Sequence, residues 1–117
     1  EAGAALDAIR NCPVPVIAYV NGDAIGGGAE LALACDMRMQ AAHARIGYIQ
    51  AKLAITSAWG GGPDLFRLVG PSRALRMMSR CELVAAELPG ERRPFGLAGE
   101  PGRVQAGYRS GHGRPPQ

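Results

Sequence analysis

The chain has 117 residues, of which 47% are apolar and 20% are charged, and its formal net charge is +3. This length allows one small domain or part of one, so these residues cannot form several domains. No apolar run approaches the roughly 20 residues that span a bilayer, and the N-terminus lacks a signal-peptide pattern, so we expect a cytoplasmic internal piece of a protein without membrane partners.

The first elements predicted along the chain are a short helix and a strand. Residues 4–9 have a helical pattern that must stop before Pro13 and Pro15. Residues 16–20 form a continuous apolar run, which predicts a strand buried on both faces in a parallel sheet. A glycine-rich turn follows this run, and residues 29–35 are good helix formers.

Short strands and two further helices are expected after this unit. Residues 37–40 and 45–48 are candidate strands, which completes the outline of an α/β layer. Pro63 suits the first turn of a helix that ends at Gly70 and buries four apolar side chains, Leu65, Phe66, Leu68 and Val69. Pro71 begins another helix, whose predicted apolar face is Leu75, Met77 and Met78.

Composition changes sharply near Pro89. Residues 1–88 hold 49 apolar residues, whereas residues 89–117 hold six, together with 12 Gly or Pro, five Arg and two Glu. So little apolar surface cannot offset the entropy of ordering, and we therefore expect residues 1–88 to form a partial domain and residues 89–117 to be a disordered tail. A frameshift would account for this change in composition. Scattered arginines without interleaved aromatics do not favour nucleic-acid binding.

The three cysteines do not indicate a metal or a disulfide framework. Cys12, Cys35 and Cys81 are far apart, form no C-x-x-C pair and have no histidine at ligand spacing. We interpret them as small buried hydrophobes in a reducing compartment, and we expect no metal site.

The glycine-rich turn is the strongest chemical feature. A strand that leads through glycines into a helix presents backbone N–H groups and a positive dipole end, which stabilise an anion or a developing oxyanion. Leu31 stands where a dinucleotide fingerprint needs glycine, and the lone lysine, Lys52, is not placed as in a P-loop. An oxyanion hole remains, with Glu30 in the same helical turn as either a dipole-stabilising residue or a general base.

A resemblance to a known family runs from about residue 13 to residue 79. Its first part is PVPVIAYVNGDAIGGGAELALACDMRM, and its second part is ARIGYIQAKLAITSAWGGGPDLFRLVGPSRAL. Together they resemble the enoyl-CoA hydratase/isomerase (crotonase) family. The resemblance implies part of the α/β crotonase-like (ClpP/crotonase) spiral fold, with short parallel strands and helices. It also implies an acyl-CoA substrate whose coenzyme A is part of the thioester, no permanently bound cofactor, and a homotrimeric or hexameric parent.

The same resemblance implies a set of site residues. Gly27 would donate one oxyanion-hole N–H to the thioester carbonyl, and Glu30 would be the first catalytic carboxylate. The substrate pocket would include Ala24, Ile25, Gly26 and Trp59. The family would supply the other oxyanion-hole N–H and most coenzyme A contacts from a preceding segment, and further helices after Ser79, where CELVAAEL begins like that continuation.

Two residues depart from the hydratase pattern. Gln50 stands twenty positions after Glu30, where hydratases carry a second catalytic glutamate. An amide cannot exchange a proton, but it can orient water or hold a substrate carboxylate. Trp59 replaces a small residue, and SAWGG resembles the corresponding phrase of acyl-CoA decarboxylases in the same superfamily. Trp59 either excludes water from the acyl pocket or belongs to the core.

Three functions therefore stay open. The first is an enoyl-CoA hydratase or isomerase that stabilises a thioester enolate. The second is an acyl-CoA decarboxylase of the alkylmalonyl-CoA type, which Gln50 and Trp59 favour. The third is an inactive fragment that catalyses nothing.

Overall fold

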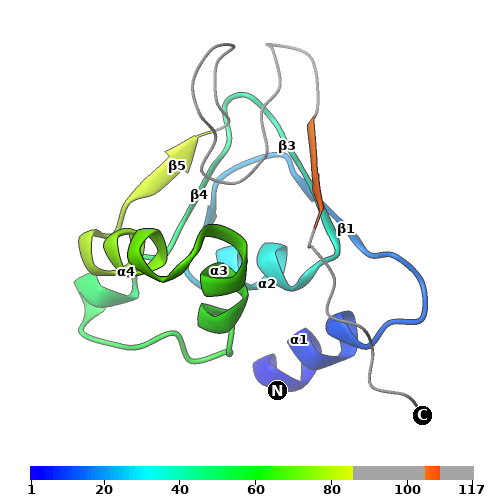
Figure 1. Ribbon diagram of the computed structural model, residues 1–117, viewed down its shortest axis with the longest axis horizontal. Helices are drawn as coiled ribbons and strands as arrows, with labels where there is room; N and C mark the ends of the chain where they lie inside the picture. The colour runs from blue at the N-terminus through cyan, green and yellow to red at the C-terminus, as the bar shows by residue number, and fades with distance from the viewer. Residues whose placement is uncertain (86–104, 109–117) are drawn as a thin grey trace.

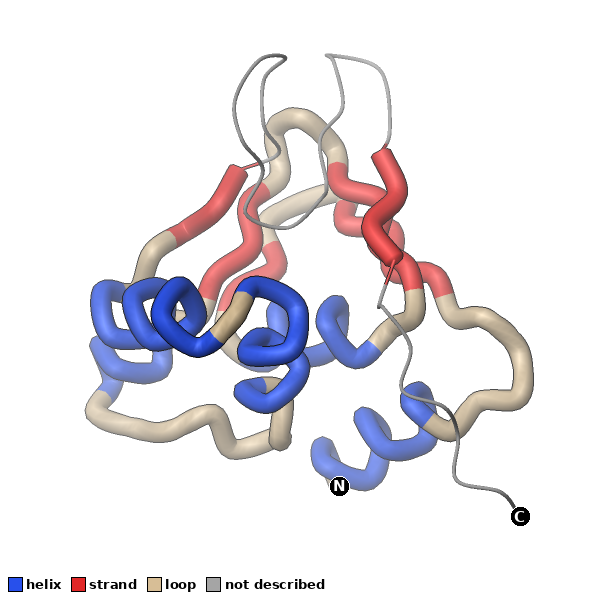
Figure 2. The backbone as a smooth tube through the Cα atoms, in the orientation of Figure 1, coloured by secondary structure: helices blue, strands red, loops and turns tan. Residues whose placement is uncertain are grey.

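A computed structural model describes residues 1–85 and 105–108. The strands lie together in the upper part of Figure 1, and the helices lie below them, an arrangement that Figure 2 shows by colour. No helix in the described part of the chain is long and apolar enough to cross a membrane. The elements in chain order are α1 (Ala2–Arg10), β1 (Ile17–Val20), β2 (Ala24–Ile25), α2 (Gly27–Ala34), β3 (Met37–Gln40), β4 (Arg45–Gly47), the 3-10 helix η1 (Gln50–Leu53), α3 (Gly62–Val69), α4 (Pro71–Arg80), β5 (Leu83–Ala85) and β6 (Gln105–Tyr108).

The described strands form two small sheets, ordered β1-β3-β6 and β2-β4-β5. The β1–β3 and β2–β4 pairs are parallel, with Ile17 opposite Met37 and Ala24 opposite Ile46. A parallel pair needs a crossover connection, and α2 lies on the path from β1 to β3. This arrangement confirms the expected α/β unit of short parallel strands and helices.

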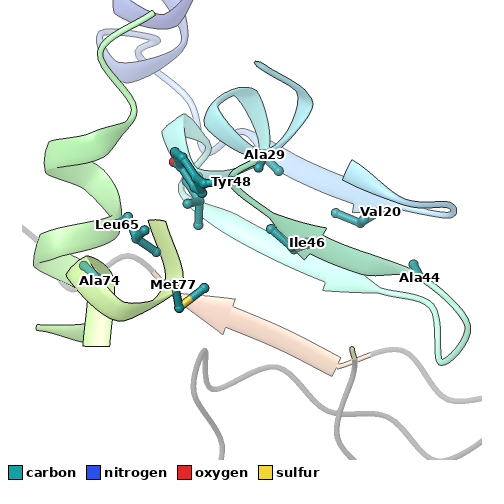
Figure 3. Packing of buried hydrophobic residues seen from close by; sticks show 10 residues of the cluster. Val20, Ala29, Ala44, Ile46, Tyr48, Leu65, Ala74 and Met77 are labelled. Atoms are coloured by element: carbon teal, nitrogen blue, oxygen red, sulfur yellow. The ribbon is translucent and has the colours of Figure 1, made fainter. Parts of the chain in front are cut away.

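The core lies between these strands and the helices. Helix α2 is buried along most of its length, and Ile46, Tyr48, Leu65 and Met77 pack in the same cluster (Figure 3). Ala29 and Glu30 are buried, so packing holds the side chains on this side of the first turn of α2 in position. The core therefore fixes the end of the helix at which the glycines lie.

Burial differs from the sequence prediction at several apolar positions. The expectation that the first strand is buried on both faces is wrong, because Ile17 and Tyr19 are 52% and 59% exposed. Successive side chains of a strand point to opposite faces, and no described residue covers this face of β1. In α4, Leu75 is 64% exposed, since Ala74 and Met77 form the buried side. Phe66 of α3 is also exposed, whereas Leu65 is fully buried.

The end of the chain departs from expectation in two places. Leu83–Ala85 form β5 beside β4, where the resemblance implied a helical continuation. Cys81 ends α4 with a left-handed backbone at φ 53°, so the chain leaves the helix before these residues. Gln105–Tyr108 form β6 antiparallel to β3, although we expected no regular structure there. The remaining tail residues, 89–104 and 109–117, lie outside the described residues.

Candidate active site

Gly26, a predicted pocket residue, and Gly27, the predicted oxyanion-hole residue, lie in a tight turn between β2 and α2. Gly26 has φ 59° and ψ −119°, a backbone region that is essentially restricted to glycine, and its N–H donates to the Gly47 carbonyl at 2.9 Å. Gly27 begins α2 directly after this turn, so its N–H has no acceptor within the helix. Ala24 and Ile25 form the strand that leads into the turn, and both are partly buried. The predicted pocket residues of this segment are therefore contiguous with the helix N-terminus.

Glu30 is buried one helical turn after Gly27 and is only 1% exposed. Its Oε2 accepts a hydrogen bond from the Gly61 N–H at 2.8 Å, and its Oε1 accepts one from Gln50 Nε2 at 2.9 Å. Residues three apart in a helix lie on the same face, so the carboxylate is on the side of α2 that carries Gly27. A buried carboxylate with both oxygens hydrogen-bonded is held in one orientation beside the helix N-terminus.

Gln50, which the resemblance placed at the position of the second glutamate, contacts Glu30. The residue is 8% exposed, and its amide nitrogen donates a hydrogen bond to Glu30 Oε1. Gln50 Oε1 therefore points away from the carboxylate. No described residue donates a hydrogen bond to this buried oxygen. It is an acceptor ready for an O–H or N–H donor that is not part of the described chain.

Trp59 lies against the first glycine of α2. An ideal Cβ built on Gly27 would be only 2.5 Å from Cη2 of the indole ring, so a glycine is needed at this contact. The Trp59 residue is still 40% exposed. The plain-core interpretation of Trp59 is therefore wrong, and the partly exposed ring covers the side of Gly27 where a Cβ would lie.

The sequence reasoning missed the residues that hold Glu30 from the other side. Gly61 must be glycine, because an ideal Cβ there would be 2.6 Å from Glu30 Cβ. The Tyr48 hydroxyl donates to the Gly61 carbonyl at 3.0 Å. Burial raises the pKa of Tyr48, and the negative charge of Glu30 raises it further, so the phenol stays protonated as a donor. The second glycine cluster before Pro63 was the signal that could have identified Gly61.

An arginine from the start of the chain also reaches this region. Arg10 Nη2 donates to the Gly60 carbonyl at 2.8 Å and to Asp64 Oδ2 at 2.6 Å, and Asp64 is 4% exposed. The 50 residues that separate Arg10 from Gly60 explain why no local pattern indicated this contact. Within the described residues, no cluster of histidine, cysteine and acidic side chains is suited to hold a metal ion.

Three kinds of comparison relate this chain to known proteins. A family profile described as enoyl-CoA hydratase/isomerase matches residues 1–91. Human mitochondrial methylglutaconyl-CoA hydratase is 47% identical over 75 residues, which are 64% of this chain and 22% of that protein. Chicken ethylmalonyl-CoA decarboxylase is 35% identical over 82 residues, which are 70% of this chain and 28% of that protein.

A solved structure shares the fold. The enoyl-CoA hydratase of Bacillus anthracis superposes with a TM-score of 0.71 at 39% identity, and the match covers 73% of this chain and 33% of that one. The chain thus spans about a quarter of the length of the curated relatives that it matches. The residues that the family profile matches contain both glycine clusters.

Proposed function

Because the chain belongs to the enoyl-CoA hydratase/isomerase family, we propose that it carries the proton-transfer part of an acyl-CoA active site, acting on an α,β-unsaturated thioester. The observation that carries this proposal is the buried Glu30 carboxylate, held by the Gly61 N–H and the Gln50 amide on the same face as Gly27. A positioned carboxylate beside a helix N-terminus suits chemistry in which a proton moves while negative charge develops nearby.

Hydration would proceed with Glu30 as the proton carrier. The thioester carbonyl oxygen accepts a hydrogen bond from the Gly27 N–H, where the helix dipole stabilises the enolate that forms. Water adds its oxygen to the β-carbon while its proton passes to Glu30. The same carboxyl group then gives a proton to the α-carbon, so Glu30 returns to its starting state. Isomerisation would use the same enolate and the same carboxylate.

Gln50 would orient the attacking water in this reaction. Its Oε1 is buried and accepts no hydrogen bond from a described residue, so it can receive one O–H of the water. A second glutamate at this position would share the proton transfers, whereas Gln50 leaves them to Glu30 alone. The acyl group would lie beside Ala24, Ile25 and Gly26, with the exposed Trp59 ring as one wall.

Decarboxylation of an alkylmalonyl-CoA is a second candidate. The exposed Trp59 ring beside Gly27 favours it, because an apolar wall next to a substrate carboxylate disfavours the charged group and hence favours its loss as carbon dioxide. The carbon–carbon bond to the carboxylate breaks, and its electron pair forms the same enolate at Gly27. Glu30 takes up a proton from solvent water and delivers it to the α-carbon, so the carboxylate returns to its starting state. The similarity to chicken ethylmalonyl-CoA decarboxylase also supports this candidate.

An assay with both substrate types distinguishes these candidates. The protein is the 117-residue chain, extended on each side by the flanking segments of the Bacillus anthracis enoyl-CoA hydratase. Hydration of an enoyl-CoA and carbon dioxide release from an alkylmalonyl-CoA are followed separately. Glu30→Gln should lower the observed turnover by about 10²-fold or more, the usual value of a positioned acid–base group.

The Gln50→Glu variant is the matched discriminator. A second carboxylate should increase hydration, and it should decrease decarboxylation because it repels the substrate carboxylate. Turnover that Glu30→Gln leaves unchanged would contradict the role of Glu30. If the extended protein without substitutions catalyses neither reaction, the result supports the inactive-fragment candidate.

A further inference from the structure

The peptide between Gly60 and Gly61 lies between a cation and the Glu30 carboxylate. Its N–H donates to Glu30 Oε2 at 2.8 Å, and its C=O accepts from Arg10 Nη2 at 2.8 Å. One peptide group therefore connects a guanidinium to the candidate catalytic carboxylate. We propose that Arg10 is a positioning residue for Glu30, and that it acts by selecting the orientation of this peptide.

Backbone sterics alone do not select that orientation. Gly60 has φ +87°, and both residues of the peptide are glycines, so no side chain opposes a rotation of the peptide plane. In the rotated state, the Gly60 carbonyl oxygen would point toward Glu30 in place of the Gly61 N–H. Two negative oxygens would then face each other in a buried space. A contact on the side away from Glu30 is therefore needed to keep the Gly60 carbonyl in its observed direction.

Arg10 is itself held rigidly in this position. Its Nε and Nη2 donate to Asp64 Oδ2 at 3.1 and 2.6 Å, and the Asp64 side chain is 2% exposed. Asp7 binds the third guanidinium nitrogen, Nη1, at 2.8 Å. The planar arginine fork is thus fixed on one edge by carboxylates while Nη2 reaches the Gly60 carbonyl. This geometry couples the end of α1 to the first turn of α3.

The contact also strengthens the hydrogen bond to Glu30. A charged donor on a peptide carbonyl polarises the peptide and makes its N–H a better donor, an effect of roughly 10–30% per bond. The next peptide is held in a similar way, since Tyr48 donates to the Gly61 carbonyl at 3.0 Å. Arg10 therefore affects both the direction and the strength of the Gly61 N–H donor. This inference rests on the proposed role of Glu30 as the proton carrier.

The amide proton of Gly61 reports this contact directly in the 117-residue chain. In wild type we expect a downfield proton shift and slow exchange with solvent, as for a hydrogen bond to a buried carboxylate. In Arg10→Met we expect the shift to move upfield and exchange to become about tenfold faster or more, because one charge-assisted hydrogen bond is lost. The Gly26 amide, bonded to the Gly47 carbonyl, is the internal measure of folding.

Arg67→Met is the matched control. Arg67 also pairs with Asp64, at 3.3 Å, but no hydrogen bond joins it to Gly60. We expect the Gly61 amide to keep its shift and exchange rate in this variant. An equal change in Arg67→Met would mean that Arg10 acts only through general stabilisation around Asp64, which overturns the proposal.

Arg10→Lys covers the case in which Arg10→Met loses its fold, as judged from the Gly26 amide. A single ammonium group keeps the charge beside Asp64 but lacks the planar fork, so the Gly61 amide should lose at least about half of its downfield shift. A Gly61 amide that is unchanged in a folded Arg10→Met or Arg10→Lys variant overturns the proposal. None of these measurements requires turnover, so failure of the proposed function and failure of this inference give different results.

Discussion

The two glycine clusters, Gly26–Gly28 and Gly60–Gly62, are similar in sequence and differ in what their N–H groups do. Each cluster immediately precedes or begins a helix, α2 in one case and α3 in the other. Gly27 begins α2, so its N–H has no acceptor within the helix, and we have proposed that it binds the thioester carbonyl. The N–H of Gly61 is already bonded to Glu30. Two segments of similar composition thus differ in one respect: the Gly61 N–H already has a carboxylate acceptor, whereas the Gly27 N–H has no acceptor within its helix.

The clusters also interlock through one side chain each. Trp59, which precedes the second cluster, packs on Gly27, and Glu30, which follows the first cluster, packs on Gly61. Each glycine is small because the other segment occupies its side-chain space. The two contacts differ in kind, since Gly27 faces the end of an aromatic side chain and Gly61 faces the backbone and Cβ of a helix residue. This difference predicts unequal costs for the same substitution.

Gly61→Ala should have the largest effect on stability. Its Cβ would lie 2.6 Å from Glu30 Cβ and 2.9 Å from Glu30 Cα, and backbone atoms of a buried helix cannot move away. The backbone of Gly61, at φ −80° and ψ −12°, suits alanine, so the cost is steric. We expect the free energy of unfolding in urea to fall by about 3 kcal/mol, the upper range for overpacking a core.

Truncating the neighbour should not rescue this variant. Glu30→Ala keeps both Cα and Cβ, so the Gly61→Ala penalty should remain in the Glu30→Ala background. A penalty that disappears there would show that the carboxylate arm, and not the backbone of α2, is the obstacle.

Gly27→Ala should cost less, about 1–2 kcal/mol, because the clashing atoms are the outer ring carbons of Trp59, 2.5–2.9 Å from the new Cβ. The ring is partly exposed and can swing out. Trp59 is the one tryptophan of the chain, so its fluorescence emission should shift to the red as the ring moves into water. Trp59→Ala should remove the penalty, in contrast to Gly61. A penalty that persists in Trp59→Ala would contradict the interlock.

Local signals predicted the parts of this arrangement that are close in sequence. Prolines and glycines set the limits of β1, α2 and α3, and the resemblance carried the pairing of Glu30 with Gln50 across twenty residues. The exposure of Ile17 was not predictable, because an apolar run has the same letters whether one or both faces of its strand are covered. Burial depends on neighbours that the pattern does not name.

The supports of Glu30 were not predictable for a related reason. Arg10 reaches Gly60 because α1 and α3 both pack against α2, and Tyr48, the residue after β4, reaches Gly61, the residue before α3. A helix-end arginine and a strand-end tyrosine have no special sequence context. Their partners are backbone carbonyls, which every residue possesses, so the sequence carries no complementary signal.

Tyr48→Phe should change the pH dependence of stability. Since burial raises the pKa of Tyr48 above its ordinary value of about 10, the folded chain keeps the proton where the unfolded chain has lost it. Above about pH 10, loss of the Tyr48 proton from the unfolded chain lowers the free energy of unfolding by about 1.4 kcal/mol per pH unit. Below that pH, the stabilisation that Tyr48 contributes is fully present.

In Tyr48→Phe, the free energy of unfolding should therefore decrease less steeply as the pH rises above about 10. At neutral pH it should cost only about 1 kcal/mol, because the Gly61 carbonyl still accepts the Leu65 N–H at 3.1 Å. Urea unfolding of both proteins across the alkaline range measures the difference. Parallel curves for Tyr48→Phe and wild type would show that the phenol is not buried as described.

Gly28→Ala should have the smallest effect and the opposite sign. Gly28 follows Gly27 directly in the first turn of α2, but an ideal Cβ there has its nearest neighbour, Ala24 Cβ, at 4.0 Å. Its φ is not positive, so alanine fits the backbone, and the lower entropy of the unfolded chain should stabilise the protein by about 0.5–1 kcal/mol. Urea unfolding of Gly28→Ala and Gly27→Ala shows whether the cost of a substitution comes from the contact with Trp59 or from any position in this glycine cluster. A loss of stability in Gly28→Ala equal to that in Gly27→Ala would mean that the first turn of α2 excludes side chains generally, and Trp59 would then not be the reason for glycine at Gly27.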